Sequence, residues 1–233
     1  MRGKMLNIDY THHLLYSRTA ERVIRRRLRE TYPEDQTLWP ETQRIYCDFL
    51  RELPYLGGKS NFQAQSVYDC IALFAYYQAV PEKPGLREFE SMVEQLFVSP
   101  YARLSPVNWR WRWVQRAAQK IFTRLARNSR LHQEDWPGNY RMFSEPFAPG
   151  KGVRFHYESC PIADFARTHG FQHLMPAMCN PDYTSMAQIK AVLIRTTTCA
   201  FGPVCDYRLV SQDSPLVREH PLYTDEDGFL RNK

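Results

Sequence analysis

Apolar residues recur with two different spacings in this chain of 233 residues, and the spacing changes near residue 150. Over the first 130 residues they return every three or four positions among charged neighbours, which predicts helices. Beyond residue 150 they alternate with polar residues, as at Val153, Phe155 and Tyr157, which predicts strands. We therefore expect an α+β fold, with an all-helical N-terminal part followed by a small mixed α/β C-terminal part that contains an antiparallel sheet.

Three segments are expected along the chain. Residues 1–130 form the helical part, with helices over 11–32, 40–53, 62–80, 86–97 and 107–129. Pro40 should occupy the first position of the second helix, and Trp113 and Ile121 should lie on the apolar face of the fifth. Residues 131–150 are expected to be a connecting loop, because Pro137, Pro146 and Pro149 interrupt every period. Residues 151–233 form the α+β part, and both parts are compatible with one compact domain.

The cysteine content and the N-terminus indicate a reducing compartment. Six cysteines in 233 residues are too few for a disulfide scaffold. The first residues lack the apolar core of a secretory signal, so we expect free thiols and a cytoplasmic location. The longest apolar run, residues 70–77, is eight residues, and a membrane span needs about 20. No membrane partner is therefore expected.

A basic stripe is expected on the fifth helix. Arg112, Arg116, Lys120 and Arg124 follow each other at intervals of four residues, in a chain whose net charge is +6. Such a stripe is most often a solvated helix face. An acidic partner or a nucleic acid is the alternative, but nucleic-acid binding is disfavoured because no helix-turn-helix, zinc-finger or RNA-recognition motif accompanies the stripe.

The common nucleotide and hydrolase motifs are absent from the sequence. Gly58-Lys59-Ser60 resembles the end of a phosphate-binding loop, but position 53, where that loop needs a glycine, is Leu53. The Gly57-Gly58-Lys59 turn still offers backbone N–H groups and a positive charge to a carboxylate. We therefore include Gly58 and Lys59 among the candidate substrate-binding residues; the alternative is an ordinary helix entry.

Reactive side chains concentrate between positions 156 and 208. That segment contains four of the six cysteines, three histidines, several aspartates, Arg195 and Arg208. Such a concentration in the non-helical third of the chain predicts a functional site.

The same segment carries a family resemblance. Four runs of residues carry it: Cys160-Pro161-Ile162-Ala163-Asp164-Phe165, the run from Leu174 to Tyr183, the run from Leu193 to Gly202, and Cys205-Asp206-Tyr207-Arg208. Together they resemble the L-2-amino-thiazoline-4-carboxylic acid hydrolase family. The resemblance covers roughly residues 55 to 210. It implies a hydrolase that opens a ring at a carbon bonded to nitrogen or sulfur, with thiol groups important for the reaction.

The candidate catalytic residues follow from the chemistry of such a ring opening. A thiolate adds to a C=N or amide carbon faster than water does, provided that a cation or a histidine lowers its pKa. Cys205 is the first candidate nucleophile. Cys160 is the second because it precedes Pro161, where we expect a helix to begin, and Cys179 is the third. His173 is the candidate base, unless it is a structural histidine.

Carboxylates and a guanidinium complete the candidate site. Arg195 lies in an apolar strand and must find a carboxylate, either Asp182 or Asp206 within the chain, or that of a substrate. Strand alternation places Cys205 and Tyr207 on one face and Asp206 on the other. The candidate catalytic set therefore includes Asp182 and Asp206, and Arg195 and Thr198 join the substrate-binding set.

The expected function is hydrolysis of a small, carboxylate-bearing cyclic amidine, lactam or thiazoline. The alternative is a non-catalytic ligand- or metal-binding module, in which Cys160, His173, Cys179 and Cys205 hold zinc or iron. No cofactor is firmly expected, and a divalent metal, Mn or Zn, remains open. The sequence is also compatible with a homo-oligomer.

Overall fold

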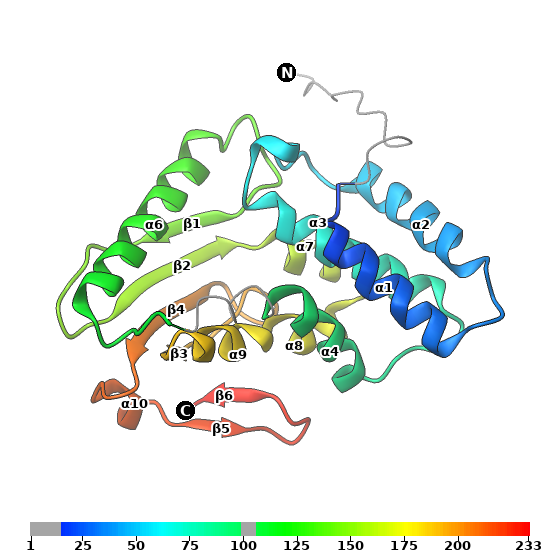
Figure 1. Ribbon diagram of the computed structural model, residues 1–233. Helices are drawn as coiled ribbons and strands as arrows, with labels where there is room; N and C mark the ends of the chain where they lie inside the picture. The colour runs from blue at the N-terminus through cyan, green and yellow to red at the C-terminus, as the bar shows by residue number, and fades with distance from the viewer. Residues whose placement is uncertain (1–14, 99–105) are drawn as a thin grey trace.

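The computed structural model describes residues 15–98 and 106–233, apart from the side chain of Lys59 (Figure 1). Residues 11–14 of the first expected helix lie outside this range. Among the helices of residues 15–98 and 106–233, none combines the length and the hydropathy that a membrane-spanning helix requires.

The N-terminal half is helical, as the periodicity predicts. Its helices are α1 (Arg18–Thr31), α2 (Leu38–Glu52), α3 (Ala64–Ala79), α4 (Leu86–Phe97) and α6 (Arg112–Leu131), with a short 3-10 helix η1 (Gly58–Ser60) before α3. The Ser17 hydroxyl accepts a hydrogen bond from the Ala20 N–H and so caps α1. Pro40 is the third residue of α2 and not its first, because the helix already begins at Leu38. Helix α3 is buried along most of its length and forms the centre of the helical part.

The C-terminal half contains a four-stranded antiparallel sheet in the order β1-β2-β4-β3. Its strands are β1 (Arg141–Ser144), β2 (Val153–Ser159), β3 (Ala191–Ile194) and β4 (Cys205–Ser211). Helices α7 (Pro161–Thr168), α8 (Met175–Cys179) and α9 (Pro181–Gln188) and the 3-10 helix η2 (Gln172–Leu174) connect β2 to β3. Helix α10 (Leu216–Glu219) and a separate hairpin, β5 (Leu222–Thr224) and β6 (Leu230–Asn232), end the chain. The α+β prediction is therefore confirmed.

The structure corrects the interpretation of residues 131–150 as a connecting loop. Arg141–Ser144 forms the edge strand β1, which pairs with β2. A strand of four residues is too short for its alternation to stand out. Pro146 and Pro149 follow the strand, so they interrupt no ladder hydrogen bond.

The inner face of the fifth helix also differs from the prediction. Trp113 and Ile121 are exposed, whereas Val114, Phe122 and Ala126 pack toward the sheet. The Phe122 ring stacks on Phe155 of β2 with centroids 4.1 Å apart. Trp109 is buried, but it precedes the first residue of the helix. Counting helical spacing from Trp109 therefore assigned the wrong side of the helix as the apolar face.

One hydrophobic cluster joins the two halves of the chain. It contains buried residues of α1–α4 together with residues of α7 and α8 and the strand residue Cys205. Phe74 of α3, for example, stacks on Phe171, with centroids 5.0 Å apart. The core therefore crosses the expected boundary between residues 1–130 and 151–233.

Candidate functional site

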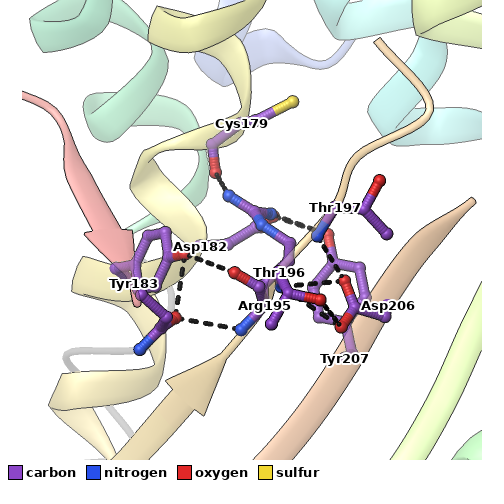
Figure 2. A network of polar contacts seen from close by, with 9 residues as sticks. Cys179, Asp182, Tyr183, Arg195, Thr196, Thr197, Asp206 and Tyr207 are labelled. Carbon is purple, nitrogen blue, oxygen red and sulfur yellow. Dashed lines mark hydrogen bonds and ion pairs between the residues drawn. The ribbon is translucent and has the colours of Figure 1, made fainter. Parts of the chain in front are cut away.

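Arg195 is the centre of a buried polar network at the end of β3 (Figure 2). Its side chain is 2% exposed and forms an ion pair with Asp182 of α9. Nη1 donates to Asp182 Oδ2 at 2.6 Å, and Nη2 donates to the Cys179 carbonyl at 2.9 Å. Asp182 is therefore the carboxylate that pairs with Arg195, among the partners that the sequence analysis considered.

Tyr207 completes the pair between Arg195 and Asp182. Its hydroxyl donates to Asp182 Oδ2 at 2.6 Å and accepts a hydrogen bond from Arg195 Nη1 at 3.2 Å. Asp182 differs from its partners because its side chain is 42% exposed. The carboxylate therefore links the buried network to solvent.

Two thiols lie close enough to Arg195 for its charge to act on them. Burial raises the pKa of Cys205 to about 12, although Arg195 and a hydrogen bond with Tyr207 act in the opposite direction. Burial likewise raises the pKa of Cys179 to about 11, against the effect of Arg195. Both thiols are therefore protonated at neutral pH in the resting site.

Cys160 occupies the N-cap position of α7, as the sequence predicts. The expected stabilisation of its thiolate is outweighed, however. Burial raises the pKa of Cys160 well above its usual range, and the backbone hydrogen bond from Ala163 only partly opposes this. The free energy of desolvating a thiolate exceeds the contribution of one helix terminus here. All six cysteines are free thiols.

Asp206 and Thr198 shape the connection between β3 and β4 and do not bind Arg195. The Asp206 carboxylate accepts hydrogen bonds from the N–H groups of Thr196 and Thr197, at 2.9 and 2.7 Å (Figure 2). The Thr198 carbonyl accepts the N–H of Gly202 at 2.8 Å. A Cβ on Gly202 would lie 2.3 Å from Thr197 Oγ1, so this tight turn needs glycine.

His173, the candidate base, is exposed and bonded elsewhere. Its Nε2 lies 3.2 Å from the Tyr77 hydroxyl, and its Nδ1 lies 3.1 Å from the Gly170 carbonyl oxygen. Within the described part of the chain, no hydrogen bond or ion pair joins it to the Arg195 network. The structure thus supports the structural alternative for His173 more than the catalytic one.

The Gly57-Gly58-Lys59 turn packs against a different part of the molecule. Gly57 has φ of +91°, and a Cβ there would lie 2.6 Å from the ring of Trp136. Asn61, after the turn, donates to Asn139 Oδ1 at 2.9 Å. Across the described residues, no hydrogen bond connects Gly58 to the Arg195 network, and the Lys59 side chain is outside the described structure.

The four side chains proposed as zinc or iron ligands do not assemble into a metal site. Among the residues that the structure describes, no group of three or more His, Cys, Asp or Glu is placed to hold a metal ion. His173 in particular is held by Tyr77, as described above.

Three residues of the network were not among the sequence candidates. Tyr183 and Tyr207 place their rings against the guanidinium of Arg195, with Cζ 5.0 and 5.4 Å from the ring centroids. Asn232 of β6 accepts hydrogen bonds from the Arg195 N–H at 2.9 Å and from the Tyr183 hydroxyl at 3.1 Å. Strand alternation already placed Tyr207 beside Cys205. No sequence signal pointed to Asn232, the penultimate residue.

Comparison with known proteins supports the resemblance noted in the sequence. Searches of curated proteins and of solved structures find no significant match. The model of the family described as L-2-amino-thiazoline-4-carboxylic acid hydrolase matches residues 65–209, a span that begins in α3 and ends in β4. This span includes Asp182, Arg195, Cys205 and Tyr207, and it covers more than half of the chain. The chain therefore belongs to the L-2-amino-thiazoline-4-carboxylic acid hydrolase family.

Proposed function

We propose that this protein is a hydrolase that opens a small, carboxylate-bearing heterocycle at a C–N or C–S bond with the help of a thiol. The observation that carries the proposal is the network around Arg195. A buried cation, two thiols and a phenol–carboxylate pair meet there, within the span that matches the family. The carboxylate and the ring of the substrate are proposed from the family's name.

Cys205 is the proposed nucleophile. Cys205 shares a strand face with Tyr207. Burial raises the pKa of its thiol, but the charge of Arg195 lowers it and so favours the thiolate. Tyr207 in turn donates to Asp182, which reaches solvent. This arrangement offers a path for the thiol proton, from Cys205 through the Tyr207 hydroxyl to the Asp182 carboxylate. The charge of Arg195 also acts on Cys179, but Cys179 ends helix α8 and is not on the strand face of Tyr207.

In the proposed reaction, the Cys205 thiolate adds to the ring carbon that is doubly bonded to nitrogen. The π electrons move to that nitrogen, which takes a proton. The bond from the same carbon to the ring nitrogen or sulfur then breaks, and the leaving atom keeps the bonding pair and takes a proton. At the same time a lone pair on another heteroatom of that carbon re-forms a double bond to it. Water attacks the resulting carbon–sulfur adduct and releases the opened product and the free thiol. One water molecule is consumed, and no electrons are gained or lost.

Arg195 is proposed to act on these groups and not on the substrate carboxylate. Both terminal nitrogens of its guanidinium already donate hydrogen bonds within the chain. Its charge is therefore best placed to stabilise the Cys205 thiolate and the carboxylate of Asp182.

The test is a panel of cyclic amidines, lactams and thiazolines, with and without a carboxylate, assayed by loss of the ring chromophore. We expect turnover of a carboxylate-bearing member by the wild-type chain and its loss in Cys205→Ser, since a serine hydroxyl is a far weaker nucleophile without a strong base. Cys70→Ser is the matched control, because Cys70 is buried in α3. Equal turnover by both variants would rule out Cys205 as the nucleophile.

A further inference from the structure

The outward side of α6 combines six cations with exposed apolar side chains. We call this surface the α6 outer face. Its cations are Arg112, Arg116, Lys120, Arg124, Arg127 and Arg130, and its apolar residues are Trp111, Trp113, Ile121 and Leu131. The helix contains no acidic residue. Its opposite side packs on β1 and β2, as Figure 1 shows at the left of the molecule.

The charges of the α6 outer face are not neutralised within the described structure. None of its six cations forms an ion pair with a described residue, whereas Arg25 and Arg44 on α1 and α2 each pair with a glutamate. The segments outside the described residues, 1–14 and 99–105, contain a single acidic residue, Asp9. Close to the start of the helix, Asp213 is already paired with Arg110.

The apolar side chains of this face are unusually exposed for their size. Trp113 is 65% exposed, Ile121 57% and Leu131 67%. The Trp111 and Trp113 rings stack on each other, with centroids 5.8 Å apart. Helical spacing places Trp113 and Leu131 in line along the axis, with Lys120 and Arg124 within about 20° of that line and Ile121 about 80° to one side. The cations and the apolar side chains are therefore interspersed on one outward surface.

We propose that the α6 outer face docks on the surface of a bilayer containing anionic phospholipids. This differs from the sequence-based expectation of no membrane partner, which rested on spanning length alone, because contact with a bilayer surface needs no spanning helix. Cations attract the phosphate headgroups, and tryptophan with aliphatic side chains is favourable at the boundary between headgroups and acyl chains. The helix has 20 residues, so it presents a contact line of about 30 Å. The proposal is independent of the function proposed for the Arg195 network.

A bilayer explains this face better than a nucleic acid does. Phosphates of a nucleic acid would bind the cations, but they offer nothing to the exposed Ile121 and Leu131. A bilayer surface accommodates both the charged and the apolar residues.

The test is co-sedimentation of the full chain with vesicles of phosphatidylserine and phosphatidylcholine, compared with vesicles of phosphatidylcholine alone. We expect binding to the anionic vesicles only, and a decrease in binding as salt is added. Each cation near an anionic surface contributes roughly fivefold to partition, so Lys120→Gln/Arg124→Gln should weaken binding about 30-fold. Trp113→Ala should weaken it further without changing its salt dependence.

The matched control is Arg25→Gln/Arg44→Gln, which removes the same net charge from exposed positions on α1 and α2. We expect this control to bind anionic vesicles within about twofold of wild type, since these cations lie away from the α6 outer face. Circular dichroism checks that every variant is folded. Equal loss in the two double variants, equal binding to both vesicle types, or binding to duplex DNA in place of vesicles would each overturn the proposal.

Discussion

Neutralising Asp182 should destabilise the chain more than removing the cation that it pairs with. Arg195 is 2% exposed and Asp182 is 42% exposed. In Asp182→Asn the guanidinium stays buried without its counterion, and water cannot reach it. In Arg195→Met the carboxylate that remains is already open to water and keeps its hydrogen bond from Tyr207. The two single substitutions are therefore unequal, although they break the same ion pair.

The burial of each charge determines how much each substitution should lower the free energy of unfolding. Leaving a buried charge unpaired costs about 3–5 kcal/mol, which is the range we expect for Asp182→Asn. Arg195→Met loses the hydrogen bonds of a charged donor, including the one to the Cys179 carbonyl, and should cost about 1.5–3 kcal/mol. The double variant, Asp182→Asn/Arg195→Met, also removes the unpaired guanidinium, so it should be more stable than Asp182→Asn alone.

Urea denaturation of the wild type, the two single variants and the double variant measures these free energies. Exposed Asp48→Asn, which breaks surface ion pairs with Arg44 and Arg51, is the control and should change stability by less than about 1 kcal/mol. If the double variant is as unstable as the sum of the two single variants, the charges do not interact, and the reasoning about Arg195 burial fails.

Three further predictions concern the thiols and the C-terminal hairpin. Because burial raises the pKa of Cys205 to about 12, very little thiolate is present at neutral pH, and the proton must pass to Asp182 during the reaction. We therefore expect kcat/KM to be flat between about pH 7 and 9, and a tenfold rise per pH unit would contradict the proton path through Tyr207. Burial raises the pKa of Cys179 to about 11 from 9.0, so at about pH 8 its thiolate fraction is about 100-fold lower than that of a free cysteine. A thiol reagent should therefore modify Cys179 slowly in the native chain, whereas all six cysteines should react rapidly in urea. Asn232→Ala leaves the Arg195 N–H without an acceptor and the Tyr183 hydroxyl with only the Arg195 carbonyl. The free energy of unfolding in urea should therefore fall by about 1–3 kcal/mol. Leu222→Ala, exposed in the same hairpin, should change stability by less than about 0.5 kcal/mol.

The sequence predicts the elements whose apolar periods are long. Helix α3 and strands β2 and β4 appear close to where their patterns place them. Strand β1 was missed because four residues give too little alternation to recognise. The inner face of α6 was misassigned because Trp109, which is buried, precedes the helix and does not share its phase.

The candidate site was partly predictable for a related reason. Alternation placed Cys205 and Tyr207 on one face. Because a buried guanidinium needs a carboxylate, Asp182 was one of the three partners considered for Arg195, with Asp206 and a substrate carboxylate. The pKa directions were not predictable, because they depend on how deeply the tertiary structure buries each thiol. The contact between Asn232 and Arg195 spans 37 residues, and no local pattern encodes it.

The most direct test of the account is detection of the covalent adduct on Cys205. A turning-over sample is quenched in acid, digested and analysed by mass spectrometry, with a carboxylate-bearing substrate from the panel. We expect an added mass equal to the ring-opened substrate on the peptide that contains Cys205, and none on the peptides that contain Cys160 or Cys179. An adduct on another cysteine, or rapid turnover with no adduct on any cysteine under conditions that trap thioimidates, would contradict it.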